Sequence, residues 1–175
     1  MRSLKRIIAI ALLCATLAIC ACGCAAKSKP LLKYEDSEIS VNLFQLYLSR
    51  MKGTLCSADY FGTTAKKDSF WDTIVDAYEK TTYNTLYRDM VLDTAKSYLA
   101  AIALFEERGL ELPDSYIKEI DEELESLVEN VADGSKTTLN TILSEYGANY
   151  DVLREAYIIE AKIAYLREDL FGING

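Results

Sequence analysis

The chain has 175 residues, a formal net charge of −8 and no histidine. The absence of histidine excludes Ser/His triads, Cys/His nucleophile pairs and most zinc sites. An acidic chain also argues against nucleic-acid binding, in which lysine and arginine neutralise phosphates. With only 2 prolines and 8 glycines, the composition favours helices over a many-stranded sheet.

The first residues have the three parts of an export signal. Arg2, Lys5 and Arg6 give a positive start, and an apolar run over residues 7–19 leads into a stretch of small residues. This run is short for a membrane-spanning helix and suits the apolar part of a signal peptide. We therefore expect export, with an uncleaved membrane anchor as the alternative.

Three cysteines, Cys20, Cys22 and Cys24, lie where cleavage is expected. The run resembles a bacterial lipobox, in which an aliphatic residue and two small residues precede the cysteine that receives diacylglycerol. Ile19 provides the aliphatic residue and Ala21 the last small one. We expect lipidation at Cys22, with Cys24 and then Cys20 as alternatives. A metal cluster is disfavoured because the cysteines are spaced more closely than in common zinc sites.

These features divide the chain into a lipoprotein signal peptide (1–21), a short tether (22–30) and one helical domain (31–175). Cys56 is the single cysteine of that domain. A free thiol and a disulfide with Cys24 both remain open for it. No base adjoins Cys56 in sequence, so a nucleophilic role is not predicted.

The first half of the domain combines a strand-like segment with helices. Residues 31–40 contain two short extended runs around a turn, and a helix is predicted over 41–52, ended by Gly53. Residues 54–67 are expected to form an exposed irregular loop, and a second helix is expected over 69–80. The inner face of that second helix is predicted to carry four side chains: Trp71, Ile74, Val75 and Tyr78.

The longest predicted element is a helix from Tyr83 to Arg108. Its apolar residues recur every three or four positions, which is the period of one buried helical stripe. Thr82 is the expected N-cap, Gly109 can take the left-handed conformation after the last turn, and Pro113 prevents continuation. A helix of this length predicts a spine on which shorter helices pack.

Three more helices are expected after the spine, between Pro113 and Gly134, over 137–146, and from Tyr150 to Gly172. The many carboxylates of the first of these are interpreted as a solvated face, because the residue pattern of a calcium-binding loop is absent. The predicted fold is therefore all-α, with five to six helices around one long helix and a short N-terminal β-hairpin.

Four short segments stand at characteristic places in this order of elements: Glu38-Ile39-Ser40, Phe70-Trp71, Glu106–Leu112 and Ile142–Gly147. Together with the order of the elements, they resemble the N-terminal chaperone domain of SurA/PrsA-type foldases, found in lipoproteins of Gram-positive bacteria. The resemblance implies a chaperone on the outer face of the cell membrane, held by its lipid, with unfolded or nascent exported polypeptides as partners. Such foldases usually continue into a parvulin-type prolyl isomerase domain whose active site uses histidines.

Several functions remain open at this stage. The first is a chaperone that buries apolar client segments in a groove between helices, without catalysis, cofactor or metal. The others are a structural or adaptor lipoprotein of an envelope complex and an N-terminal fragment of a parvulin-type isomerase. The candidate client-binding residues are all aromatic, because such side chains suit a wet and adaptable surface: Tyr47, Tyr60, Phe61, Trp71 and Tyr78.

Overall fold

A computed structural model describes residues 29–57 and 61–172. This part of the chain contains six α-helices, one short 3-10 helix and two β-hairpins. The prediction of an all-α domain around one long helix, with an N-terminal hairpin, is confirmed. Two sets of predicted site residues lie outside the described residues, namely the candidate lipidation cysteines Cys20, Cys22 and Cys24, and the candidate client-binding residue Tyr60.

The described chain begins with an antiparallel hairpin. Strand β1 (Pro30–Tyr34) pairs with β2 (Ser37–Ser40) around a turn in which Glu35 has a φ of 53°. Ser40 then caps the next helix, since its Oγ accepts a hydrogen bond of 3.1 Å from the amide of Leu43. Strand β2 is largely buried and β1 is largely exposed, so the hairpin covers the core with one strand.

Helix α2 (Val41–Ser57) continues beyond Gly53, where the sequence predicted its end. Gly53 is exposed and has no atom near the position that a Cβ would take. A glycine inside a helix costs only about 1 kcal/mol relative to alanine, which tertiary packing can offset. The extra turn brings Cys56 against Ala65, whose carbonyl accepts from the Cys56 thiol at 3.3 Å.

The helix predicted over 69–80 is wrong. The chain instead forms a 3-10 helix η1 (Gly62–Lys66), a short helix α3 (Asp68–Trp71) and a hairpin of β3 (Ile74–Asp76) with β4 (Thr81–Thr82). The hairpin turn has a local cause, because the Asp76 carboxylate accepts from the amides of Tyr78 and Glu79 at 2.8 and 3.0 Å.

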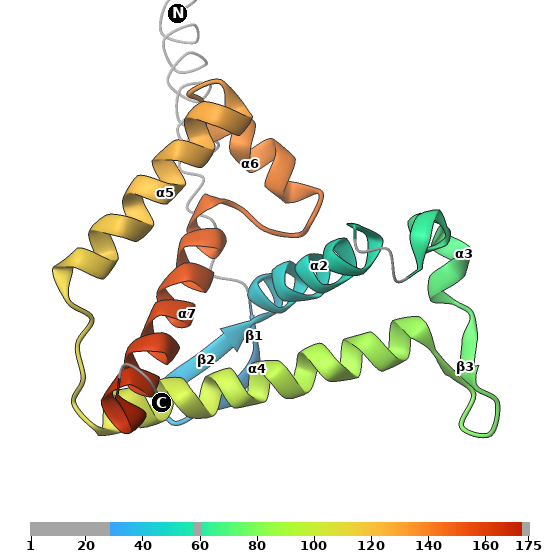
Figure 1. Cartoon of the computed structure of the whole chain (residues 1–175), viewed down its shortest axis with the longest axis horizontal. Helices are drawn as coiled ribbons and strands as arrows, with labels where there is room; N and C mark the ends of the chain where they lie inside the picture. Colours follow the sequence, from blue (N-terminus) through green and yellow to red (C-terminus); the bar gives the residue numbers. More distant parts are fainter. Residues whose placement is uncertain (1–28, 58–60, 173–175) are drawn as a thin grey trace, which may run out of the picture.

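Helix α4 (Tyr83–Glu107) is the spine, and its predicted bounds are confirmed within one residue. The Thr82 side chain accepts from the amide of Thr85, and Gly109 has a φ of 65°. Figure 1 shows α4 along the whole lower side of the molecule, with α2 and α7 lying against it. The long helix therefore joins α3 and β4, near its start, to α7.

The last three helices are α5 (Asp114–Ala132), α6 (Lys136–Ser144) and α7 (Tyr150–Phe171). Each lies within two residues of its predicted position. Asn149 caps α7 by accepting from the amide of Val152. Three large side chains at or near the ends of these helices are exposed: Val131, Tyr146 and Leu170.

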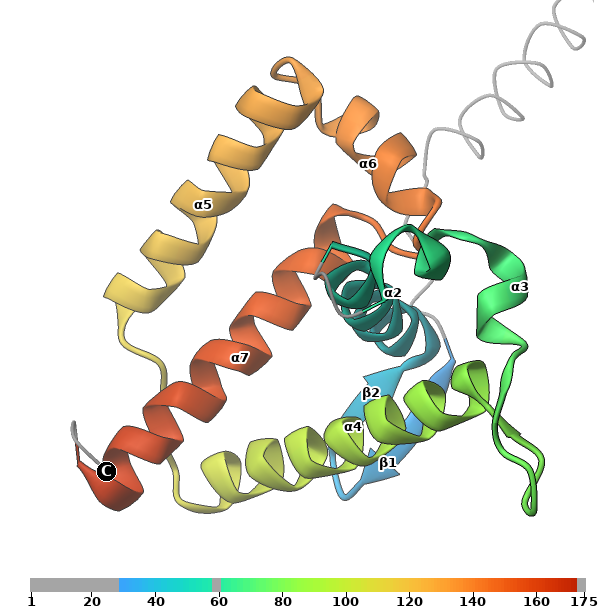
Figure 2. The ribbon, with the colours of Figure 1, turned by 45° about the vertical axis from the view of Figure 1, so that its right-hand side comes forward.

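The main hydrophobic core joins β2, α2, α4, α5 and α7. Its most deeply buried large side chains include Ile39, Leu43 and Leu124. Figure 2 shows that η1, α3 and the β3–β4 hairpin lie at the opposite end of α4 from the C-terminus. No residue of that end belongs to the main core, so contacts of its own must hold it in place.

Candidate interaction surface

We call residues 61–82, from η1 to β4, the arm. The arm rests on the first two turns of α4 through an aromatic cluster. Phe70 stacks on Tyr83 with ring centroids 4.5 Å apart, and Phe61 contacts both rings at 5.0 and 5.3 Å. Trp71 meets Tyr87 edge-on at 6.1 Å. Aromatic pairs of this geometry stabilise contacts by about 1 kcal/mol each beyond area burial, so the cluster can hold the arm without the main core.

Polar contacts fix the orientation of the indole in this cluster. The Nε1 of Trp71 donates a 3.1 Å hydrogen bond to the carbonyl of Ala65, which also accepts from Cys56. The ammonium of Lys52 lies 4.7 Å from the centroid of the Trp71 ring. Cys56 is a half-buried free thiol among the described residues.

The β3–β4 hairpin at the outer end of the arm exposes apolar side chains. Ile74 is 55 % exposed, Val75 is 40 % exposed and Tyr78 is 91 % exposed. The hydrogen bonds of the Asp76 carboxylate and the left-handed φ of 53° at Lys80 give the hairpin a tight turn. We call these three side chains the tip.

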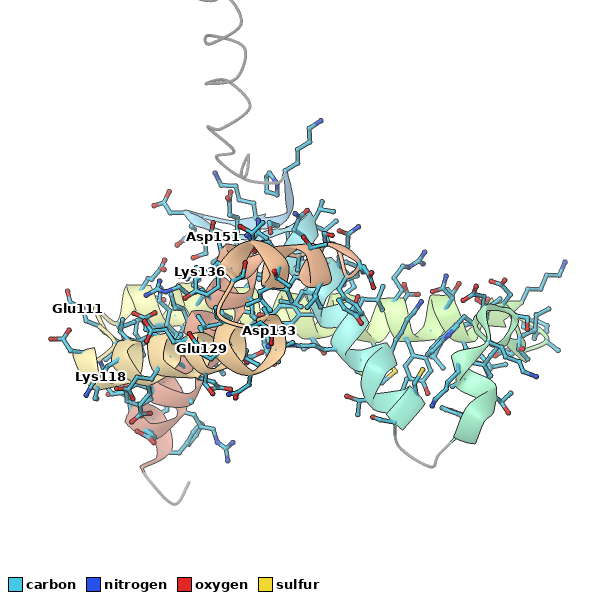
Figure 3. All side chains as sticks on the ribbon, turned by 90° about the horizontal axis from the view of Figure 1, so that it is seen from above. Glu111, Lys118, Glu129, Asp133, Lys136 and Asp151 are labelled. Atoms are coloured by element: carbon cyan, nitrogen blue, oxygen red, sulfur yellow. The ribbon has the colours of Figure 1, made fainter. Side chains whose placement is uncertain are left out.

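The arm is close to neutral, in contrast with the other end of the molecule. Residues 61–82 contain 3 basic and 4 acidic side chains, whereas residues 111–151 contain 2 basic and 11 acidic ones. Figure 3 shows part of this acidic region, with Glu111 in the loop before α5 and Glu129 on α5. The negative charge of the domain is therefore concentrated on α5 and its flanks, and the tip carries no strong electrostatic bias.

The candidate client-binding residues lie in three different places. Phe61 and Trp71 meet in the aromatic cluster, and Tyr78 projects from the tip. Tyr47 belongs to the main core at 8 % exposure, with its ring edge-on to Tyr98 at 5.5 Å. Burial raises the pKa of the Tyr47 phenol well above its ordinary value, with Glu160 adding to the effect. Tyr47 can therefore contact a client only if helices separate.

Sequence reasoning placed Ile74 and Val75 on a buried helix face, and the structure corrects this. The signal that identifies them is the run of β-branched residues before Asp76, followed by a turn-forming aspartate and two threonines. β-Branched residues favour strands, and aspartate favours turns. Read as a hairpin, this segment exposes the side chains that a helix of the same sequence would bury.

A second apolar surface lies between α2, α5, α6 and α7. It is a cavity of about 290 Å³, lined mainly by leucines together with Tyr146 and Tyr157. Arg50 forms part of its wall, and its guanidinium pairs with Glu160 at 2.6 Å and lies 5.3 Å from the Tyr157 ring. Burial, assisted by Glu123, raises the pKa of Tyr157. The sequence predicted an apolar groove between helices. Among the cavities in the described part of the chain, this one lies between helices and has a largely apolar lining.

A larger cavity of about 370 Å³ lies where the β1–β2 turn meets α4 and α7. Its central carboxylate, Glu106, accepts from the Ser37 hydroxyl at 3.0 Å and pairs with Lys162 at 3.1 Å. Arg154, on the same wall, forms an ion pair of 2.8 Å with Asp121. These charges satisfy one another, so they act as structural links between the hairpin, α4, α5 and α7.

Within residues 29–57 and 61–172, no group of three or more potential metal-ligating side chains is close enough to hold an ion. Among the helices of the same residues, none combines the length and the apolar character needed to cross a bilayer. Comparisons with protein-family models, curated proteins and solved structures found no match to this chain. The likeness to SurA/PrsA-type foldases therefore stays a prediction from the sequence.

Proposed function

We propose that the protein is an extracytoplasmic chaperone, anchored by lipid at Cys22, that binds unfolded exported polypeptides without catalysing a reaction. The observation that carries this proposal is the tip, in which Ile74, Val75 and Tyr78 are exposed on a well-defined hairpin. A group of exposed apolar side chains, unlike a single one, often marks a binding site, and these three lie within five residues of one another in the sequence. The order of elements and the lipobox-like segment add support from the sequence.

The chemistry of the tip suits weak and reversible binding. Burying an aliphatic or aromatic side chain is favourable by about 2 kcal/mol. Three such side chains give a gross gain of about 6 kcal/mol, from which the cost of ordering the client must be subtracted. The expected dissociation constant for one client segment is therefore weaker than about 40 μM. Weak affinity allows release, which a chaperone without an energy source requires.

The aromatic cluster explains how the tip can be presented. Its rings anchor the arm to α4, so Ile74, Val75 and Tyr78 are held away from the main core rather than collapsing onto it. Apolar binding without a strong charge preference accepts many sequences. The acidic region on α5 is expected to attract basic clients over longer distances and to repel acidic ones.

The proposal is tested by aggregation suppression with the full chain. A denatured client protein is diluted into buffer, and its light scattering is followed with and without the chain. The test variant replaces all three tip residues (Ile74→Ser, Val75→Ser and Tyr78→Ser), which removes apolar surface without disturbing the core. The matched control, Phe171→Ser, removes an exposed aromatic side chain at the other end of the molecule.

The wild-type chain and Phe171→Ser are expected to suppress scattering, and the tip variant is expected to lose most of the suppression. Circular dichroism must show that the variants keep the helical content of the wild type. Equal suppression by all three proteins would exclude the tip as the binding surface. No suppression by the wild type, together with co-purification of one folded envelope protein, would favour the adaptor function instead.

A further inference from the structure

We propose that strand β1 is the side of the domain that faces the membrane, where Lys29, Leu31 and Lys33 contact the headgroups of an anionic bilayer. This inference rests on the proposed lipid anchor and adds an orientation to it. It follows from the charge distribution along the chain, the length of chain before β1, and the side chains that β1 exposes.

The charge distribution of the chain is strongly asymmetric. All 27 acidic residues follow residue 34, whereas the 13 residues from Cys22 to Tyr34 contain three lysines, Lys27, Lys29 and Lys33. Lysines close to an anionic membrane strengthen attachment about fivefold each, and this attraction falls off within about 8 Å at physiological ionic strength. The beginning of the domain is thus attracted to such a surface, while its acidic helices are repelled.

The tether limits how far the start of β1 can lie from the bilayer. Seven residues separate Cys22 from Pro30, and a fully extended chain of that length spans about 25 Å. The chain enters the domain at a fixed point, because the carbonyl of Lys29 accepts a 3.1 Å hydrogen bond from the amide of Val41 at the start of α2. With an acyl chain on Cys22, the start of β1 therefore stays within about 25 Å of the bilayer, and the lysines favour its closer approach.

Strand β1 exposes side chains that suit a membrane interface. Pro30, Leu31, Lys33 and Tyr34 are all exposed, and Leu32 is half-buried against α4. Leucine and tyrosine can enter the headgroup region while lysine pairs with lipid phosphates. In the view of Figure 3, β1 lies along the upper edge of the molecule and α3 lies at the lower right, so contact through β1 leaves the arm accessible.

The contact is confined to the first part of the hairpin. The β1–β2 turn carries Glu35 and Asp36, and Lys33 lies opposite Glu38 in the strand register. Asp151 on α7 lines the cavity beside this turn. These carboxylates are expected to lift the turn from an anionic surface, so the start of β1 makes the closest approach.

The orientation is tested with the full lipidated chain in vesicles of phosphatidylcholine with or without phosphatidylglycerol. The chain has a single tryptophan, Trp71, which reports on the arm. A Leu31→Trp variant in a Trp71→Phe background places the only indole on the exposed start of β1. Lipids with a spin label near the headgroup quench an indole that reaches the interface. Circular dichroism checks that Trp71→Phe, which removes the bond to Ala65, leaves the fold intact.

We expect strong quenching of the indole at position 31 in vesicles with phosphatidylglycerol and little quenching of Trp71. Lys29→Glu with Lys33→Glu is expected to abolish the quenching at position 31. The matched control, Lys66→Glu with Lys67→Glu, makes the same charge change at exposed positions of the arm. It is expected to leave the quenching of the β1 indole unchanged.

Vesicle flotation separates failure of the orientation from failure of the anchor. If the chain floats with vesicles but both indoles are quenched equally, or neither is, the orientation is overturned and the anchor stands. Equal effects of the two double-lysine variants would also overturn it. If the wild-type chain does not float, the anchor fails and the orientation fails with it, while aggregation suppression still tests the chaperone activity independently.

Discussion

Gly147, in the turn between α6 and α7, lies directly against the side chain of Gln45 on α2, and its φ is 69°. A Cβ at Gly147 would overlap the Gln45 amide and come within 3.2 Å of the Gln45 Cβ. The amide can swing away because Gln45 is exposed, but its Cβ is fixed by the helix. The turn and α2 can approach this closely only because residue 147 is glycine.

Gly147→Ala is therefore expected to destabilise the domain more than Gly109→Ala, the matched control. Gly109 has a similar φ of 65° but has no atom near the position of a Cβ. In both variants the free energy of unfolding should fall by about 1–2 kcal/mol, because alanine is strained in the left-handed conformation. In Gly147→Ala it should fall by about 1 kcal/mol more, because the new Cβ would overlap Gln45. Urea unfolding measures both values. Equal losses would show that Gln45 relaxes without cost.

Tyr47→Phe is expected to stabilise the protein. The Tyr47 hydroxyl is buried and has no hydrogen-bond partner among the described residues. Removing a buried unsatisfied polar group relieves a desolvation cost of about 1 kcal/mol, and phenylalanine keeps the ring contact with Tyr98. The free energy of unfolding should rise by about that amount, whereas Tyr98→Phe should change it by less than about 0.5 kcal/mol. A loss of stability in Tyr47→Phe would contradict this account.

Alkaline pH is expected to destabilise the fold through three tyrosines of α2, α4 and α7. Burial raises the pKa values of Tyr47, Tyr98 and Tyr157 above the ordinary value of about 10. Their contribution to stability is complete below pH of about 10 and is lost as pH rises toward the folded-state pKa values. Stability against urea should thus fall above this pH, and less steeply in Tyr47→Phe. If the free energy of unfolding falls equally steeply with pH in Tyr47→Phe and in the wild type, ionisation of Tyr47 does not contribute to the loss of stability.

Acid should weaken one link between α5 and α7. Arg154 donates to Asp121 at 2.8 Å, and this hydrogen bond lowers the carboxyl pKa of Asp121. A lowered folded-state pKa contributes stability above the ordinary aspartate value of about 4, and the contribution is lost as pH falls through the folded-state pKa. Asp121→Asn should therefore lose less stability on acidification than the wild type, while Glu125→Gln, on the same helix, should behave as the wild type does.

The parts of the fold that the sequence predicted correctly are those with local signals. The spine begins at Thr82, a side-chain cap, and ends before Gly109, which takes the left-handed conformation. Asn149 and Gly172 delimit α7 in the same way. Caps and left-handed glycines act within a few residues of a helix end. The apolar periodicity and these terminal residues are therefore sufficient to identify such helices from the sequence.

The errors occurred where tertiary contacts or competing local signals decided the structure. Gly53 did not end α2, because the additional turn gains contact with Ala65 through Cys56. In the arm, the apolar residues have a spacing that is compatible with a helix or with a hairpin. The hydrogen bonds of the Asp76 carboxylate to the turn favour the hairpin. Tyr47, a candidate client-binding residue, is buried where α2, α4 and α7 meet, and its place on the apolar face of α2 is consistent with that burial.

The most direct test of the central claim is site-specific photo-crosslinking from the tip. A benzoylphenylalanine at position 78, and for comparison at position 171, is irradiated with a client protein in its unfolded or its native state. The account predicts crosslinks from position 78 to the unfolded client, few to the native client, and few from position 171. Equal crosslinking from both positions, or crosslinks from position 78 to native and unfolded client alike, would contradict a tip that selects unfolded polypeptides.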